Sequence, residues 1–244
     1  MGPQTHDVGA PPPTLYLIPN LLGDSHVDNA LPPLVSRVVR DLHYFLVEEP
    51  KSARKLLKSL SPDRQIRELN LALLNEHTKP HELAALLSPL VQGHNMGIIS
   101  EAGCPAVADP GSDAVRKAHE LGAKVVPLVG PCSMLLALMA SGLNGQKWRF
   151  AGYLPIDNPA REREVKKLDS EARSSGETQI FMDTPYRSHK LFLELLDLCH
   201  PDTLLCVAQG VTTPVEMIRT RSVMKWRQDP LQPAKLPTLF LLGR

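Results

Sequence analysis

A loop rich in glycine and proline, Glu101-Ala102-Gly103-Cys104-Pro105, follows the apolar run at residues 96–100. The segment Ala108-Asp109-Pro110-Gly111 then leads into a predicted helix. Because small residues allow close approach to the backbone, such a loop offers N–H and C=O groups that can pair with a nucleoside or an amino-acid moiety. On spacing alone, an ordinary strand-to-helix turn explains these glycines equally well.

A second loop, Val129-Gly130-Pro131-Cys132-Ser133-Met134, also follows an apolar run and places Ser133 at the start of a predicted helix. A helix N-terminus has unpaired N–H donors that can hold a carboxylate, such as that of a methionyl group. For Ser133 taken alone, a plain N-cap is the commoner interpretation. Two such loops after successive strands strengthen the prediction of a ligand site.

Signatures of several other enzyme classes are missing from the sequence. It contains no G-x-G-x-x-G, G-x-x-x-x-G-K-[ST] or G-x-S-x-G, which argues against a dinucleotide-dependent dehydrogenase, a P-loop NTPase and an α/β-hydrolase. His77 and His81 have i, i+4 spacing beside Glu76 and Glu82, but Pro80 lies between them at a predicted helix start. The histidines are therefore interpreted as solvated, and no bound metal is expected.

Basic side chains form a stripe on the helix predicted at residues 51–60. They have i, i+3, i+4 and i+7 spacing and are Lys51, Arg54, Lys55 and Lys58. The apolar face of the same helix contains Ala53, Leu56, Leu57 and Leu60. A second basic group comprises Arg219, Arg221, Lys225 and Arg227. Either group can meet phosphates, although a solvated face is the commoner meaning. Because 27 Lys and Arg balance 26 Asp and Glu, a nucleic acid would be recognised through such a local patch.

Short apolar runs alternate with helical patterns from Thr14 onward. Strands are expected at residues 15–18, 44–47, 66–69, 96–100 and 123–128, and helices at residues 34–42, 51–60, 80–92, 112–121 and 133–141. This alternation predicts an α/β fold with a mostly parallel, doubly wound sheet. Ligands of such sheets bind at the carboxyl ends of the strands, which is where both loops lie.

The turn-prone stretch at residues 143–147 is interpreted as a domain boundary. The sequence thus predicts a loose tail at residues 1–13, an N-terminal α/β domain at residues 14–145 and a C-terminal α/β domain at residues 146–244. In the second domain, helices are expected at residues 161–173 and 188–198, and strands at residues 178–182, 204–208, 215–219 and 238–242. The closing strands have no helices between them, which predicts a mixed sheet.

The cysteines and the apolar runs bear on the compartment. The four cysteines, Cys104, Cys132, Cys199 and Cys206, include no C-x-x-C pair, so neither a zinc knuckle nor a disulfide framework is indicated. The sequence shows no secretory leader and no uninterrupted apolar run of about 18 residues, the length that spans a membrane. A cytoplasmic protein without membrane contact is therefore expected.

Four phrases, in order along the chain, resemble a known family. Residues 99–111 and residues 126–133, Val-Pro-Leu-Val-Gly-Pro-Cys-Ser, look like the S-adenosylmethionine (SAM) binding loops of the tetrapyrrole methylase superfamily. Residues 144–155, with Phe150-Ala-Gly-Tyr-Leu-Pro155, and the phrase Phe181-Met-Asp-Thr-Pro-Tyr-Arg187 resemble the branch that contains the small-subunit ribosomal RNA cytidine 2′-O-methyltransferases. The resemblance spans nearly the whole chain after Thr14.

The resemblance implies a SAM-dependent methyltransferase that needs no metal, forms a homodimer and binds its cofactor in a cleft between two α/β domains. The residues implied to bind the cofactor are Ser100, Glu101, Cys104, Ser133, Met134, Asp183, Thr184 and Gly210. Glu101 is also the candidate general base for a ribose hydroxyl, by its location. The implied partner is ribosomal RNA, and the residues expected to guide its phosphates are Lys51, Arg54, Lys55 and Lys58.

Two loops depart from the pattern of the ribosomal branch. The first reads Ile18-Pro19-Asn20-Leu21-Leu22-Gly23-Asp24, where the branch typically shows Thr-Pro-Ile-Gly-Asn-Leu. The second reads Glu48-Glu49-Pro50, where the branch shows Glu-Asp-Thr-Arg, and the chain also lacks a C-terminal extension that many ribosomal members carry. Two alternatives therefore stay open: a methyltransferase for a tetrapyrrole or another small molecule, and a non-catalytic module that binds SAM or RNA.

Overall fold

The structure is a computed structural model that describes residues 11–232 and 234–244. Contacts divide the chain into two compact units, and each is described by itself. The first unit contains the chain up to Leu21 together with Val27–Gly130, and the second contains Leu22–His26 together with Pro131–Arg244. Most of the tail expected at residues 1–13 lies outside the described residues.

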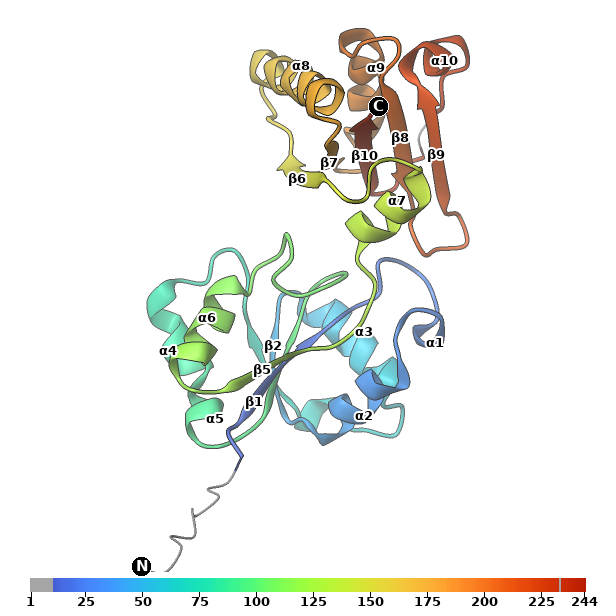
Figure 1. The fold of residues 1–244 in the computed structure, drawn as a ribbon. Helices are drawn as coiled ribbons and strands as arrows, with labels where there is room; N and C mark the ends of the chain where they lie inside the picture. The colour runs from blue at the N-terminus through green and yellow to red at the C-terminus, as the bar shows by residue number, and fades with distance from the viewer. Residues whose placement is uncertain (1–10, 233) are drawn as a thin grey trace, which may run out of the picture. The chain divides into compact units, whose positions relative to one another are not determined.

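The first unit is built on a five-stranded sheet with the strand order β3-β2-β4-β1-β5 (Figure 1). Its strands are β1 (Thr14–Ile18), β2 (Tyr44–Val47), β3 (Asn70–Leu73), β4 (Met96–Ile99) and β5 (Lys124–Pro127). Its helices are α1 (Val27–Ala30), α2 (Pro33–Asp41), α3 (Pro50–Leu60), α4 (Leu83–Leu86), α5 (Ser88–Val91) and α6 (Ser112–Glu120), with short 3-10 turns η1 (Ile66–Glu68) and η2 (Pro80–Glu82). Every strand pair is parallel.

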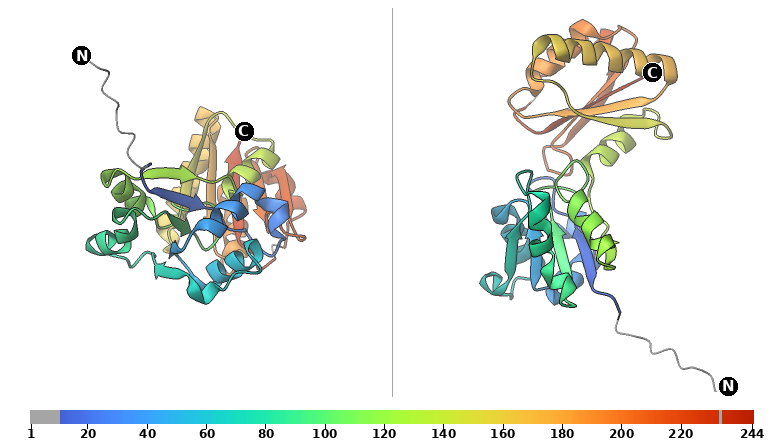
Figure 2. Two further views of the ribbon diagram at one scale, coloured as in Figure 1. Left: turned by 90° about the horizontal axis from the view of Figure 1, so that it is seen from below. Right: turned by 90° about the vertical axis from the view of Figure 1, so that its left-hand side faces the viewer.

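Helices cover both faces of this sheet (Figures 1 and 2). Successive side chains of a strand point to opposite faces, and the core follows that rule. Phe45 belongs to an apolar cluster with residues of α2 and α3. Its neighbour Leu46 belongs to a second cluster with residues of α4, α5 and α6. The predicted parallel, doubly wound sheet is confirmed.

The second unit has a mixed five-stranded sheet with the strand order β6-β7-β10-β8-β9. Its strands are β6 (Trp148–Tyr153), β7 (Thr178–Asp183), β8 (Leu204–Gln209), β9 (Met217–Ser222) and β10 (Thr238–Gly243). Its helices are α7 (Ser133–Ser141), α8 (Asn158–Ser175), α9 (Ser188–Leu198) and α10 (Val223–Gln228). Only β6 and β7 pair in parallel, and the other three pairs are antiparallel. The predicted mixed sheet is confirmed.

Helix α7 belongs to the second unit, so the first unit ends at Gly130, before the boundary expected at residue 145. The boundary lies there because α7 packs against the sheet of the second unit. α7 contacts β9 and β10, and Met134, Ala137 and Leu138 share an apolar cluster with Ile180 and Leu241. α8, α9 and α10 contribute instead to the apolar cluster on the other face of that sheet.

Three expected elements of the chain differ from the structure. The strand expected at residues 66–69 is wrong, because Ile66–Glu68 form the 3-10 turn η1 and the strand of this region, β3, starts at Asn70. The helix expected at residues 80–92 is divided into η2, α4 and α5, with Pro89 in the first turn of α5. The strand expected at residues 215–219 is β9, which starts at Met217. In each case the periodicity gave the region, while pairing and proline geometry set the bounds.

Candidate functional site

The loops of interest in the first unit follow adjacent parallel strands. β1 and β4 pair with Ile18 opposite Ile99, and β2 pairs with β4 with Val47 opposite Ile99. The residues that come next in each strand therefore emerge at the same carboxyl edge of the sheet. This register brings Asn20 and Glu48 to the loop that begins at Ser100.

Asn20 holds that loop through several hydrogen bonds. Its side-chain Nδ2 donates to the carbonyl oxygens of Ser100, at 3.0 Å, and Glu101, at 2.9 Å. Its backbone forms an isolated antiparallel bridge with Gly103, with N–O distances of 2.8 and 3.2 Å. The Glu101 N–H donates to Oε2 of Glu48 at 2.8 Å. Much of the backbone at residues 100–103 is thus engaged inside the protein, rather than open to a ligand as the sequence alone predicts.

The three expected site residues of this loop have different surroundings. Ser100 is 2% exposed, and its hydroxyl donates to the Gly103 carbonyl at 3.0 Å. The Glu101 side chain is exposed. Cys104 is half-buried, with its Sγ 4.0 Å from the Gly130 carbonyl oxygen, which brings the loop after β4 to the loop after β5.

Asp109 lies further along the same loop and was not singled out from the sequence. It follows Ala106 and Ala108, which have φ of 64° and 59°, a left-handed conformation that a Cβ disfavours. Burial, and then the charges of Glu48 and Glu101, raise the pKa of Asp109 from 3.8 to about 7. A carboxyl with a pKa near neutrality is suited to accepting a proton.

The raised pKa of Asp109 predicts a pH-dependent effect of Asp109→Asn. A carboxyl that binds its proton more tightly in the folded than in the unfolded state lowers stability as pH rises from about 4 to about 7. The amide removes that loss. We expect the variant to gain roughly 1–2 kcal/mol at about pH 8, allowing for solvent screening of this half-buried group, and little at about pH 4. Denaturant unfolding at both pH values measures the difference, and an equal effect at both would contradict it.

In the second unit, Asp183 and Thr184 lie at the carboxyl end of β7. The Asp183 carboxylate is buried, and its Oδ1 accepts hydrogen bonds from Thr184 N at 2.7 Å and from Arg187 Nε at 2.9 Å. The Thr184 carbonyl accepts from the N–H groups of Arg187 and Ser188. This turn therefore leads directly into α9.

Gly210 lies at the same edge of the second sheet. Thr238 of β10 pairs with Asp183 on one side and with Gln209 on the other, which places the ends of β7 and β8 two strands apart. Gly210 has a φ of 54°, and a Cβ there would lie 2.9 Å from Thr213 Oγ1. Glycine is therefore required both by conformation and by space.

Thr212, which the sequence did not indicate, is unusual in two ways. Its φ is 71°, which is rare for a β-branched residue. Its Oγ1 is buried and has no hydrogen-bond partner among the described residues. An unpaired buried hydroxyl is costly unless a ligand or a water satisfies it. No sequence pattern reveals such an atom, because its burial depends on the fold.

Ser133 and Met134 begin α7. Cys132 occupies the N-cap position without a side-chain cap, and Ser133 is the first helical residue, so the N-cap interpretation of Ser133 is wrong. The Met134 side chain is 6% exposed and shares its apolar cluster with Val211, the residue after Gly210. Its side chain therefore serves the core, and only its backbone is left for a ligand.

The histidines, acidic residues and cysteines of the described part of the chain limit the kinds of site that it can form. Within residues 11–232 and 234–244, no group of three or more His, Cys, Asp or Glu is arranged to hold a metal ion. His77 lies 3.7 Å from Glu76, and both side chains are exposed. The four cysteines are free, and burial raises the pKa of Cys199 to about 12 and of Cys206 to about 11, so these two thiols are unreactive. In the same described part of the chain, no helix has the length and apolar character needed to cross a membrane.

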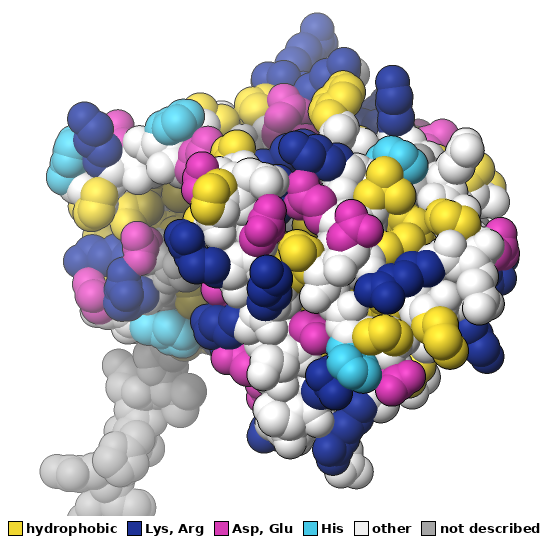
Figure 3. Space-filling view, turned by 90° about the horizontal axis from the view of Figure 1, so that it is seen from above, with side chains coloured by type: hydrophobic (Ala, Val, Ile, Leu, Met, Phe, Trp, Pro, Cys, Tyr) yellow, Lys and Arg dark blue, Asp and Glu magenta, His cyan; other side chains and the backbone are white. Residues whose placement is uncertain are grey.

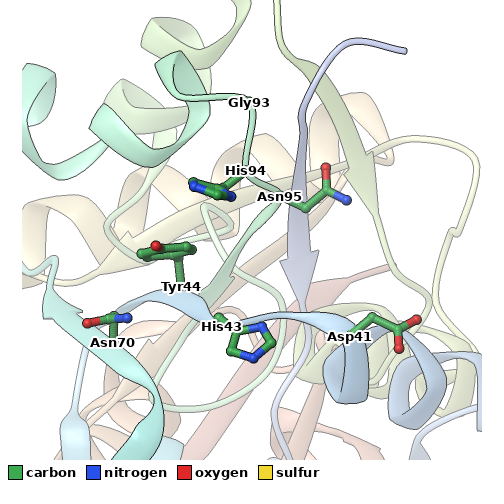
Figure 4. Close-up of a pocket in the computed structure, with 7 residues that line it drawn as sticks. All are labelled: Asp41, His43, Tyr44, Asn70, Gly93, His94 and Asn95. Atoms are coloured by element: carbon green, nitrogen blue, oxygen red, sulfur yellow. The ribbon is translucent and has the colours of Figure 1, made fainter. Parts of the chain in front are cut away.

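A pocket of about 410 Å³ lies at the opposite edge of the first sheet (Figure 4). It is lined by Asp41, His43, Tyr44, Asn70, Gly93, His94 and Asn95. Tyr44 and Asn70 are the first residues of β2 and β3, and the rings of Tyr44 and His94 are 5.1 Å apart. Because ligands of open parallel sheets bind at the carboxyl ends of the strands, this pocket is not the site formed by the loops above.

Several curated relatives of the chain share one description. The chain is 30% identical over 209 residues to a "Ribosomal RNA small subunit methyltransferase I" of Vibrio cholerae. The aligned residues cover 85% of this chain and 68% of the relative. The chain is 30% identical over 207 residues to the protein of that name from Escherichia coli O157:H7, covering 84% of this chain and 67% of the relative. No family model matches the chain.

Two solved structures with a similar fold are also described as methyltransferases. The methyltransferase CobJ is 21% identical, with a TM-score of 0.61, over 96% of this chain and 95% of that protein. Uroporphyrin-III C-methyltransferase from Thermus thermophilus, in complex with S-adenosylhomocysteine, is 17% identical with a TM-score of 0.58, over 95% of this chain and 97% of that protein. At these identities the similarity establishes the fold alone.

Proposed function

This chain belongs to the ribosomal RNA small subunit methyltransferase I family, and from that premise we propose that it transfers a methyl group from SAM to small-subunit ribosomal RNA. The observation that carries the proposal is the identity to these relatives over most of the chain. The ribose 2′-hydroxyl is the proposed acceptor, following the resemblance of the Phe181–Arg187 phrase to the 2′-O-methyltransferase branch.

Structural features at both candidate loops fit SAM. In the first unit, exposed Glu101 and half-buried Asp109 lie in one loop, and their carboxylates suit a sulfonium cation. In the second unit, the unpaired buried Oγ1 of Thr212 lies next to the Gly210 turn and suits a polar group of the cofactor.

The residues proposed to hold SAM contribute in different ways. The proposed contacts are Glu101, Cys104, Ser133, Thr184 and Gly210, together with the backbone of Met134. Ser100 and Asp183 are proposed to shape their loops, because their side-chain polar groups bond within those loops. The proposed site uses no metal.

The protein's part in the reaction is to position the acceptor and to remove a proton. When bound, SAM supplies an electrophilic methyl carbon. A ribose hydroxyl becomes a better nucleophile when a base accepts its proton. Glu101 is proposed as this base, and Asp109 is a second carboxyl whose pKa, raised to about 7 by burial and by neighbouring charges, suits the task.

Glu101→Gln tests the assignment of the base. The amide keeps the size of the side chain but cannot accept the proton, so we expect turnover to fall by about 10²-fold or more, and SAM affinity to fall by much less, because the amide oxygen can still contact the cofactor. Single-turnover rates and calorimetric titration with SAM measure the two quantities. An unchanged rate would remove Glu101 from this role, and the matched Asp109→Asn variant then shows whether the neighbouring carboxyl fulfils it.

RNA is proposed to approach the basic face of α3. Lys51, Arg54, Lys55 and Lys58 are exposed, while Ala53, Leu56, Leu57 and Leu60 are buried. The helix starts two residues after Glu48, which holds the Glu101 N–H, so the basic face begins at the edge of the candidate site. On the face of the protein seen in Figure 3, acidic and basic side chains are interspersed.

The assembly and the compartment remain parts of the proposal. A homodimer that works in the cytoplasm is proposed from the family resemblance. Light scattering of the purified protein measures the oligomeric state: a mass of about twice 26.9 kDa supports the dimer, and a monomer contradicts it.

The proposed activity is tested by offering labelled SAM with competing acceptors. Wild-type protein is incubated with methyl-labelled SAM, small ribosomal subunits and a tetrapyrrole in one reaction. The proposal predicts label in the RNA fraction. Label in the tetrapyrrole favours the small-molecule methyltransferase, and bound SAM without transfer favours the non-catalytic module.

A further inference from the structure

We propose that Asn20 is a positioning residue that sets the conformation of the cofactor-binding loop at residues 100–104. The inference rests on the proposed function for its consequence in catalysis, and on the hydrogen bonds of Asn20 for its geometry. Asn20 is 5% exposed, so its side-chain amide is buried and forms its hydrogen bonds inside the protein.

The side chain of Asn20 is matched to the loop atom by atom. An amide has two N–H donors and one carbonyl acceptor. Nδ2 donates to the carbonyl oxygens of Ser100 and Glu101, at 3.0 and 2.9 Å. Oδ1 accepts the N–H of Leu21 at 2.8 Å. No other side chain of this size offers both donors and the acceptor.

The backbone of Asn20 closes the other half of the loop. Its N–H donates to the Gly103 carbonyl at 2.8 Å, and its carbonyl accepts the Gly103 N–H at 3.2 Å. Gly103 has a φ of 73°, a conformation that glycine adopts without strain. The hydroxyl of Ser100 also donates to the Gly103 carbonyl, at 3.0 Å. The turn from Ser100 to Gly103 is thus fixed at both ends by one residue of the loop after β1.

Glu101 depends on this arrangement for its direction. Its carbonyl is held by Asn20, and its N–H is held by Glu48 Oε2 at 2.8 Å. Since both peptide groups that flank its Cα are fixed, the Cα–Cβ bond of Glu101 leaves the loop in a defined direction. Asn20 therefore acts on the reaction through Glu101 and the loop, without contacting the substrate.

The position of Asn20 indicates what the unusual first loop does in the structure. Asn20 stands in the stretch Ile18–Asp24, where the chain departs from the pattern of the ribosomal branch. Its close packing extends to Pro19: a Cβ on Gly130 would lie 2.2 Å from Pro19 Cβ. The altered loop thus supplies the support for the cofactor loop, which argues against lost activity as the meaning of the departure.

Asn20→Asp tests the proposal with little change in shape. A carboxylate in place of the amide would face two carbonyl oxygens without a proton to donate. We expect the Kd for SAM to rise by roughly tenfold or more, as for a buried hydrogen bond replaced by an unpaired group, and the KM for RNA to stay unchanged. The loss of SAM affinity should become smaller as pH falls, because the protonated carboxyl of the variant regains one hydrogen-bond donor. The matched control is Asn144→Asp, which removes a hydrogen bond from the side-chain amide to the Gly176 carbonyl in the second unit. This variant should leave SAM affinity unchanged.

Amide hydrogen exchange on the wild-type protein gives a readout that needs no variant and no turnover. The N–H groups of Glu101 and Gly103 should exchange as slowly as those of β4, and should exchange faster in Asn20→Asp. Fast exchange at both amides in the wild-type protein would overturn the proposal, as would a variant that binds SAM like the wild type. If the wild-type protein shows slow exchange but binds no SAM, the proposed function fails while the positioning of the loop stands.

Discussion

Neutralising three basic residues of α3, by Lys51→Gln, Arg54→Gln and Lys58→Gln together, is expected to weaken RNA binding by roughly a hundredfold near 0.1 M salt. The side chains are exposed on one helix face, and each phosphate contact releases counterions. The slope of log K against log salt should become shallower by about 2, since each lost contact contributes about 0.7 for a single strand. Filter binding across a salt series measures both quantities.

A matched triple variant separates this effect from net charge. Arg163→Gln, Lys166→Gln and Lys167→Gln on α8 remove the same charge from exposed positions of another helix. We expect them to leave the affinity for RNA and the salt slope nearly unchanged, and both triple variants to bind SAM like the wild type. Equal weakening by the two triples would mean that RNA senses only overall charge, contrary to the proposal for α3.

Arg161→Met is expected to destabilise the second unit by about 3 kcal/mol or more. Arg161 Nε and Nη2 donate to the two Glu194 carboxylate oxygens at 2.7 and 2.8 Å, with side chains 9% and 18% exposed. Arg161 Nη1 also donates to the carbonyls of Pro155 and Ile156. Removing the guanidinium leaves the largely buried Glu194 carboxylate without its bidentate partner, with the exposed Lys190 Nζ 3.8 Å away, and removes the hydrogen bonds to the two carbonyls. Urea unfolding measures the loss.

The control for Arg161 is Arg149→Met in the same unit. Arg149 pairs with Glu171, but these side chains are 40% and 35% exposed, so the pair contributes about 1 kcal/mol or less. The hydrogen bond from Arg161, followed by its charge, holds the pKa of Glu194 below its usual value. A lowered carboxyl pKa stabilises the fold at neutral pH, and that contribution is lost as pH falls through the folded-state pKa. The gap between the variants should therefore narrow in acid, and equal losses at neutral pH would contradict the account.

The fold was largely predictable because its helices and strands follow from short-range hydrophobic patterns in the sequence. The alternation of apolar runs with helical periodicity predicted both sheets and most helices, and the basic and apolar faces of α3 lie where their spacing placed them. The membership of α7 was not predictable, since its nearly uniform apolar sequence does not say which sheet it covers. Likewise β3 starts at Asn70 because it pairs with Tyr44 of β2, a choice that periodicity alone does not make.

The candidate site was predictable at the level of loops, not of atoms. The Gly- and Pro-rich phrase at residues 101–105 marked the loop after β4, but not its support, because Asn20 lies 80 residues before Ser100 in the chain. The raised pKa of Asp109 depends on burial and on Glu48, which the sheet register brings near. The buried hydroxyl of Thr212 depends in the same way on how the turn after β8 folds. Such properties arise only when distant segments meet.

The most direct test of the proposed activity is mass spectrometry of nucleosides from small-subunit ribosomal RNA. The RNA is incubated with the wild-type protein and SAM that carries an isotopically labelled methyl group, then digested to nucleosides. The account predicts the labelled methyl group on the ribose of one nucleoside, with much less label after incubation with Glu101→Gln. Label on a base, or RNA that stays unlabelled while the protein binds SAM, would contradict it.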